Sequence, residues 1–168
     1  SEQQANRRHI VQGGWQFILL DSSVPGKVFG ELADSELAFL EDTLSQNPAL
    51  PTLVALHHHP VAIGSDWMEQ IGLRNRDAFW GVVDRFPQVR IVLWGHIHQE
   101  HDLHRKGVRL LATPSTCIQF TSGSRKFAVE ELPPGYRWFE LEASGEFRTE
   151  VRRATDFEFD LDSNSTGY

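Results

Sequence analysis

The sequence predicts an α/β fold in which a βαβαβ segment is followed by antiparallel strands. Apolar runs at 15–20, 52–57 and 89–94 have the length and composition of buried strands. Two amphipathic stretches, 34–45 and 75–85, separate these runs and are long enough to form helices. After the third apolar run the sequence changes to short alternating segments joined by turn residues. We therefore expect an α/β sheet that is extended by a second, mostly antiparallel one.

Both expected helices have residues that suit helix ends. Asp34 or Ser35 is a suitable N-cap for the first helix. Asn75 or Asp77 begins the second helix, and Pro87 lies just beyond its end.

The later strands are expected as two hairpins with a further strand between them. The first hairpin covers 100–112 with its turn at Lys106-Gly107, and the second covers 136–152 with its turn at 143–145. The residues 115–121 form the strand between them.

Composition limits the classes of function. The chain has 168 residues, enough for one core, and a formal net charge of −7, which argues against a general nucleic-acid-binding face. No apolar run approaches the roughly 20 residues of a membrane span, and the amino end has no signal-peptide pattern. Cys117 is the only cysteine, so we expect a reducing compartment and a cytoplasmic location. We expect its side chain to be a small buried hydrophobe rather than a nucleophile.

We divide the chain into one domain, 1–153, and an acidic carboxyl-terminal tail, 154–168. The tail contains no Lys or Arg, and its acids are Asp156, Glu158, Asp160 and Asp162. Aromatic and aliphatic residues alternate with these acids, so the tail is either a partly ordered terminus or a strand that docks on a surface.

Two histidine clusters follow apolar runs directly. His57, His58 and His59 precede Pro60, and Gly95 precedes the second cluster, His96-Ile97-His98. Carboxyl ends of neighbouring strands are where α/β sheets gather their ligands. Gly95 would let the backbone turn out of its strand, with His96 and His98 on one side of an extended segment. Neutral imidazoles suit Mn, Fe, Co and Zn, so the pattern predicts a metal site with hydrolytic chemistry.

The predicted site lacks oxygen ligands. No Asp or Glu follows a strand before His57, because Asp21 lies in a Leu-Asp-Ser-Ser context that reads as a turn. The other histidines, His9, His101 and His104, have no such context and are expected at the surface. By itself, the sequence predicts half of a metal site.

The two histidine motifs resemble those of the calcineurin-like metallophosphoesterases. Four segments are similar, more narrowly, to the bacterial class III cyclic-AMP phosphodiesterases: 56–60, 72–75, 95–100 and 110–117. The resemblance implies an αββα sandwich, with 1–153 as the carboxyl-terminal part of the phosphoesterase domain. It also implies hydrolysis of 3′,5′-cyclic AMP to 5′-AMP at a site with two divalent or Fe/Mn-type ions.

The resemblance also assigns residues. The His of the family's His-x-Pro motif falls on His58, with His57 and His59 as neighbours rather than ligands. His96 joins His58 on one metal, and His98 binds the other metal and lies near the phosphate as a catalytic residue. Three motifs that precede this region in the family are not found in the sequence. The 168 residues alone are therefore expected to be inactive, and their uncovered edges are expected to favour a homodimer or strand exchange.

Three alternatives stay open at this point. In the first, the substrate is a different phosphodiester, such as a glycerophosphodiester, and 61–75 is the specificity loop. Otherwise the chain is a metal-binding module without catalysis, or a structural domain whose histidines are incidental.

Overall fold

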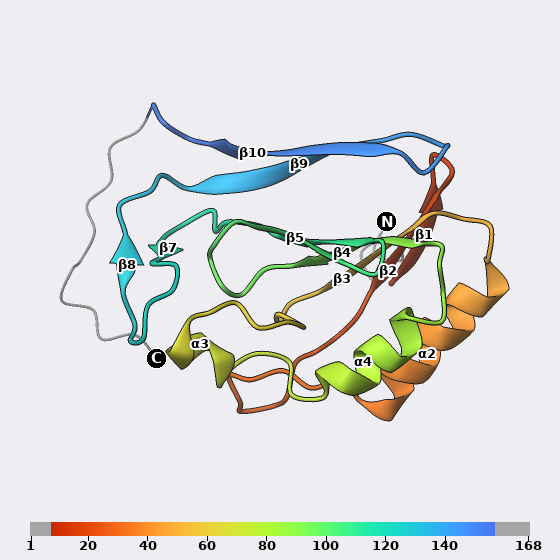
Figure 1. Cartoon of the computed structure of the whole chain (residues 1–168), viewed down its shortest axis with the longest axis horizontal. Helices are drawn as coiled ribbons and strands as arrows, with labels where there is room; N and C mark the ends of the chain where they lie inside the picture. Colours follow the sequence, from red (N-terminus) through yellow and green to blue (C-terminus); the bar gives the residue numbers. More distant parts are fainter. Residues whose placement is uncertain (1–7, 157–168) are drawn as a thin grey trace, which may run out of the picture.

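The computed structural model describes residues 8–156 as a six-stranded mixed sheet with helices on one face and a hairpin on the other (Figure 1). In spatial order the strands are β1 (His9–Gln12), β2 (Trp15–Leu19), β3 (Thr52–Leu56), β4 (Val89–Trp94), β6 (Val108–Ala112) and β5 (His101–Arg105). The helices are α2 (Asp34–Gln46), α3 (Asp66–Glu69) and α4 (Arg76–Val83). The α/β class and the βαβαβ order are confirmed.

The centre of the sheet is parallel and its edges are antiparallel. β2, β3, β4 and β6 run in parallel, while β1 pairs with β2 and β5 pairs with β6 in antiparallel fashion. The hairpin expected at 100–112 therefore belongs to the main sheet and not to a second one. Its second strand carries Leu110, Leu111 and Ala112, all buried, and a strand buried on both faces fits the interior of a sheet.

The second layer is the hairpin of β9 (Gly135–Leu141) and β10 (Phe147–Arg153), which lies across the sheet opposite α2 and α4 (Figure 1). A large core lies on the helix side of the sheet, and a smaller one lies under the hairpin. The smaller core consists of Trp15, Leu53, Ile91 and Leu111, with Phe139 and Phe147 packed against it. This order of helices, sheet and second sheet corresponds to part of the predicted αββα sandwich.

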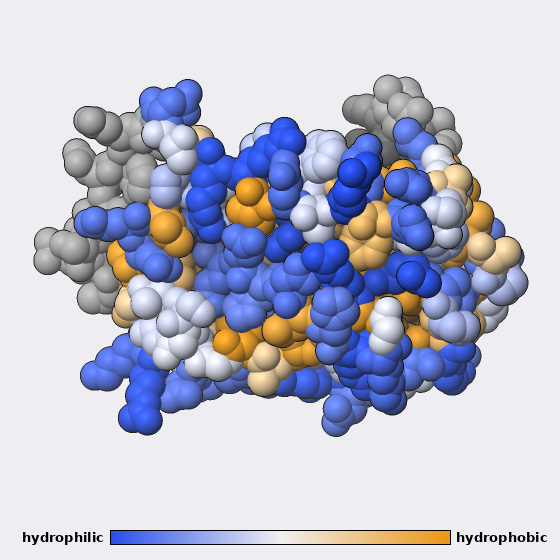
Figure 2. Space-filling model, turned by 45° about the horizontal axis from the view of Figure 1, so that its top comes forward, coloured by the Kyte–Doolittle hydropathy of each residue, from blue (hydrophilic) through white to orange (hydrophobic). Residues whose placement is uncertain are grey.

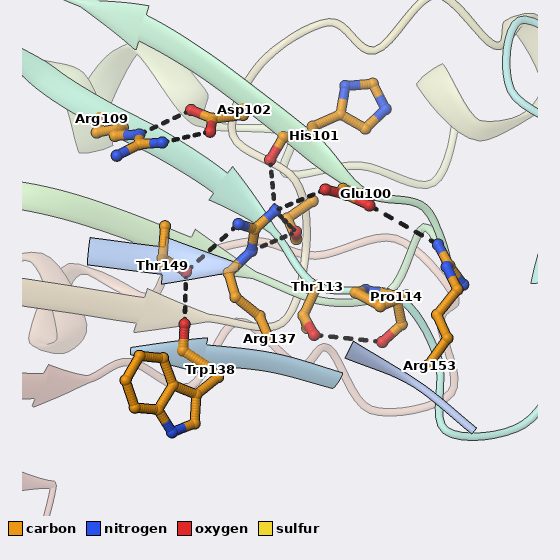
Figure 3. Close-up of polar contacts among 11 residues, drawn as sticks. Glu100, His101, Asp102, Arg109, Thr113, Pro114, Arg137, Trp138, Thr149 and Arg153 are labelled. Atoms are coloured by element: carbon orange, nitrogen blue, oxygen red, sulfur yellow. Dashed lines mark hydrogen bonds and ion pairs between the residues drawn. The ribbon is translucent and has the colours of Figure 1, made fainter. Parts of the chain in front are cut away.

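One buried arginine fastens the hairpin to the sheet (Figure 3). The side chain of Arg137 on β9 is 3% exposed. Its Nε and Nη2 donate to the carbonyl oxygen of Ala112 at 3.1 and 3.0 Å, and Nη2 also donates to His101 O at 3.1 Å. Nη1 lies 3.4 Å from Thr149 Oγ1, and Glu100 supplies a carboxylate 4.0 Å from Nη2. The guanidinium thereby joins the end of β6, the start of β5 and the hairpin.

The helix ends differ from those expected. The first helix begins at Asp34, but its N-cap is Ala33, and no side chain caps it. Asn75 is the N-cap of α4, yet its side chain bonds the backbone N and O of Leu32 rather than its own helix. Asn75 therefore joins two loops, a role that local sequence does not indicate.

Several short elements were not expected from the sequence. They are β1, α3 and β8 (Val129–Glu130). The strand expected at 115–121 is present only as β7 (Gln119–Phe120), which pairs with β8 in a small separate sheet. The prediction for Cys117 is wrong, because the residue is exposed in the loop before β7.

The expected tail falls mostly at 157–168, outside the described residues. Across 8–156, no helix has the length and apolar character needed to span a membrane.

Candidate metal centre

The two histidine clusters meet at the carboxyl edge of the sheet. β3 and β4 are parallel neighbours, with Leu56 opposite Trp94 in the register. His57 and His58 follow the first of these strands directly, and His96 follows the second after one glycine. Because parallel strands end at the same edge, the sequence prediction that the clusters converge is confirmed for these three residues.

Their ring nitrogens form one compact group. His57, His58 and His96 each offer a nitrogen, and these atoms lie within 4.8 Å of one another. Within this group, His57 Nε2 and His96 Nδ1 are 3.1 Å apart. Two nitrogens bound to one ion at right angles, each about 2.1 Å from it, are separated by about 3 Å. The donor set therefore fits a transition metal.

Backbone carbonyls fix the tautomers of two of these rings. Nε2 of His58 lies 3.1 Å from Val28 O, and Nε2 of His96 lies 3.0 Å from Ile71 O. A carbonyl oxygen only accepts, so both Nε2 atoms carry hydrogen and both Nδ1 atoms carry a lone pair. Histidine ligands of metals commonly donate their second nitrogen in this way. The Nδ1 lone pair of His58 accepts from the Ser22 hydroxyl at 2.8 Å, whereas that of His96 faces His57.

The histidines are held in the neutral form. Burial, together with the neighbouring rings of His58 and His57, lowers the pKa of His96 to about 3. Burial likewise lowers the pKa of His59 to about 4, and it shifts the pKa values of His57 and His58 downward. Neutral imidazole is the form that binds metal. At neutral pH none of the three rings therefore carries an extra proton that a metal would have to displace.

The second cluster is not the extended segment that the sequence suggested. His96 has φ 62° and His98 has φ 51°, both in the left-handed region, whereas Gly95 does not occupy that region. Left-handed backbone at non-glycine residues is uncommon and is concentrated at functional sites. The two turns direct the rings apart, so His96 joins His57 while His98 stacks on Phe120.

His98 lies in an aromatic pocket outside the group of three. Its ring is parallel to that of Phe120, with 4.3 Å between centroids and 6° between planes. Trp67 and Phe127 pack edge-on against the same Phe120 ring, at 5.3 and 5.4 Å. Burial lowers the pKa of His98 as well. Its Nδ1 is buried without a hydrogen-bond partner among residues 8–156.

The neighbouring carboxylates are engaged elsewhere. Oδ1 of Asp21 accepts from the backbone N and the hydroxyl of Ser23, at 2.9 and 2.6 Å, which confirms the predicted turn. Glu69 accepts from the backbone N of Ile63 and Gly64. In the described part of the chain, the group of three histidines includes no carboxylate.

The resemblance makes His57 a neighbour rather than a ligand, and no local sequence pattern indicates Ser22 or the carbonyl groups of Val28 and Ile71. One signal for His57 was available. It is the first residue after β3, so it lies at the exposed rim of the sheet, whereas His58 turns inward and is buried.

Comparison with known proteins gives relatives for most of the chain. No family model matches it. It is 48% identical over 156 residues to the 3′,5′-cyclic adenosine monophosphate phosphodiesterase CpdA of Pseudomonas aeruginosa, covering 93% of this chain and 57% of that protein. It is 45% identical over 162 residues to CpdA of Escherichia coli K12, covering 96% and 59%. The chain is homologous to the bacterial cyclic-AMP phosphodiesterases.

The predicted resemblance to these enzymes is thereby confirmed. The chain spans a little over half the length of the relatives it matches, 57% and 59% in these two cases. Among solved structures, GAP50 of Plasmodium shares the fold with a TM-score of 0.59 at 14% identity, covering 89% of this chain and 50% of that one.

Proposed function

We propose that the full-length protein is a metal-dependent phosphodiesterase that hydrolyses 3′,5′-cyclic AMP to 5′-AMP, and that this chain supplies the histidine side of its metal centre. The observation that carries the proposal is the convergence of three neutral imidazoles at the end of the sheet. The identity of 48% to a cyclic-AMP phosphodiesterase supports the choice of substrate.

We assign the histidines to two ions. His58 and His96 hold the first, as the resemblance implies, and His57 joins them because its Nε2 faces Nδ1 of His96. His98 holds the second ion and contacts the phosphate; its free Nδ1 supports this role. For His58 to act as a ligand, its Nδ1 must exchange the Ser22 hydroxyl for the ion.

Ions of the Mn or Fe type bound here would polarise the phosphodiester and lower the pKa of an attacking water. The protein's own contribution is to hold the rings. Val28 O and Ile71 O keep hydrogen on Nε2, and burial keeps His58 and His96 neutral. The oxygen ligands and the bridging carboxylate would come from the part of the relatives that this chain does not span. The 168 residues alone should therefore show little turnover.

Cyclic-AMP hydrolysis in Mn²⁺ tests the function, measured on the 168-residue chain and on the chain extended by the upstream segment of its natural protein. We expect turnover only from the longer protein. Faster hydrolysis of a glycerophosphodiester would replace the substrate assignment with the alternative one. Metal binding without any hydrolysis by the longer protein would identify a metal-binding module.

The ligand assignment is tested by Co²⁺ titration with visible absorption. We expect His57→Ala and His96→Ala to weaken Co²⁺ binding by roughly 100-fold or more, because each removes a facing nitrogen. His104→Ala, on the exposed edge strand β5, is the control and should change nothing. An equal loss in His58→Ala confirms it as a ligand, whereas unchanged affinity in that variant would show that His58 only packs between Ser22 and Val28. If all four variants bind Co²⁺ with the affinity of the unsubstituted chain, the histidines are incidental and the metal centre is refuted.

We also propose that the 168-residue chain associates with a second copy through an open strand edge. β1 and β5 are the edges of the six-stranded sheet. They expose apolar side chains, with Val11 53% and Leu103 40% exposed. Open edges with apolar residues favour pairing with another chain. A monomeric mass in light scattering would refute this.

The single cysteine supports a reducing, cytoplasmic location.

A further inference from the structure

Two glycines far apart in sequence lie directly against the buried histidines. An ideal Cβ built on Gly30 would lie 2.7 Å from Cβ of His58 and closer still to its ring. A Cβ built on Gly72 would lie 2.7 Å from Cε1 and 2.9 Å from Cδ2 of His59. Contacts under 3.0 Å are essentially never made by real Cβ atoms. Neither glycine has a positive φ, so the reason for glycine at these positions is space and not backbone conformation.

The two glycines belong to one backbone bridge. Gly30 N donates to Gly72 O at 3.1 Å, and Arg74 N donates to Gly30 O at 2.8 Å, which makes a parallel bridge between Gly30 and Leu73. Leu73 N also donates to His59 O at 3.1 Å. The bridge therefore packs directly against the first histidine cluster.

The same two segments supply the carbonyls that fix the tautomers. Val28 O, two residues before Gly30, accepts from His58 Nε2. Ile71 O, one residue before Gly72, accepts from His96 Nε2. A shift of either segment would therefore move two things together: the glycine that contacts a histidine ring, and the carbonyl oxygen that accepts a hydrogen bond from one.

His59 transmits the contact of Gly72 to the second cluster. Its ring is fully buried and stacks on the ring of His96, with 5.9 Å between centroids and 18° between planes. Neither of its nitrogens has a hydrogen-bond partner in the described part of the chain. Packing alone, between the Gly72 backbone and His96, therefore sets its orientation.

We propose that Gly30 and Gly72 are positioning residues for the metal centre: their missing side chains let the bridge press against His58 and His59 and so set the planes of the His58 and His96 rings. The consequence for metal binding rests on the proposed function, but the ring orientations themselves do not. An Ala at Gly30 must displace the His58 ring, and an Ala at Gly72 must displace His59 and, through the stack, His96.

The test uses the 168-residue chain with Gly30→Ala, Gly72→Ala and the matched control Gly81→Ala. Gly81 is in α4 and a Cβ there meets nothing within 4 Å. The first readout needs no metal: imidazole nitrogen chemical shifts by NMR at pH 7.5. We expect the His58 nitrogens to shift in Gly30→Ala, the His59 and His96 nitrogens in Gly72→Ala, and none of them in Gly81→Ala.

The second readout is Co²⁺ affinity, which we expect to fall 10- to 100-fold in both bridge variants, as for other supporting contacts of metal ligands. In a His59→Ala background, Gly72→Ala should cause no further loss, because the clashing ring is gone. Unchanged imidazole shifts in both bridge variants overturn the proposal, even if their melting temperatures fall. Shifted rings without any Co²⁺ binding by the unsubstituted chain would support the positioning and refute the proposed metal centre instead.

Discussion

The histidine end of the sheet and the hairpin layer both contain buried polar side chains. Those under the hairpin have hydrogen-bond partners, whereas several at the histidine end have none in the described part of the chain. Arg137 under the hairpin finds acceptors for its donors on Ala112, His101 and Thr149. His59 is completely buried with both ring nitrogens unpartnered in the described part of the chain, and His98 leaves Nδ1 free. Buried polar groups are normally hydrogen-bonded, so the exceptions need a reason. Arg137 therefore serves the fold, whereas hydrogen bonds within residues 8–156 do not account for the buried nitrogens of His59 and for His98 Nδ1.

Figure 2 shows a predominantly hydrophilic face with hydrophobic side chains between and below the polar ones. The outer side of the hairpin carries charged pairs such as Arg148–Glu140 and Arg152–Glu150, which are open to solvent. Such exposed pairs contribute little to stability, so the attachment of the hairpin depends on its inner side.

The largest expected effect is at Arg137. Arg137→Met should lower the free energy of unfolding by about 3 kcal/mol, because it removes charge-assisted hydrogen bonds and leaves buried carbonyl groups without a donor. Denaturant unfolding measures the loss. Arg148→Met, whose side chain is 74% exposed, is the control and should leave the midpoint where it is. Equal midpoints for Arg137→Met and the parent chain would show that the apolar contacts alone hold the hairpin.

The next prediction concerns the pH dependence of the free energy of unfolding, which depends on the buried histidines. The pKa of His59 is about 4 and that of His96 about 3 in the folded chain, both below the ordinary value of 6.5. The unfolded chain therefore binds more protons between about pH 3 and 6.5, so stability is fully present above pH 6.5 and is lost as the pH falls through this window.

Urea midpoints at pH 7.5 and pH 5 measure this loss. His59→Asn should flatten the dependence, whereas His104→Ala should not. A stability that does not change between these pH values would mean that the buried rings take up protons in the folded chain at the same pH as in the unfolded chain.

A smaller effect is expected at the aromatic pocket. Phe120 is 2% exposed and stacks on His98. Phe120→Leu should cost about 1 kcal/mol of unfolding free energy through lost stacking and volume. In the upstream-extended protein it should also reduce cyclic-AMP turnover more than Co²⁺ binding at the group of three, because His98 lies outside that group. Loss of both in equal proportion would show that the pocket acts on the whole centre.

Local sequence was enough to predict the strands at β2, β3 and β4, the two main helices, and the meeting of His57 and His58 with His96. Each of these follows from local apolar periodicity and from the rule that parallel strands end at one edge. The half-site prediction also came from the sequence, since Asp21 reads as a turn and is one.

The tertiary structure alone decided how the histidines are used. The carbonyl of Val28 is 30 residues from His58, and that of Ile71 is 25 residues from His96. Contacts across such separations leave no periodic signal, so these carbonyl contacts, the close approach of Gly30 and Gly72 to the rings, and the anchoring by Arg137 were not accessible from sequence. The left-handed backbone at His96 and His98 was likewise not accessible from sequence, because the surrounding packing and not the residue type imposes it.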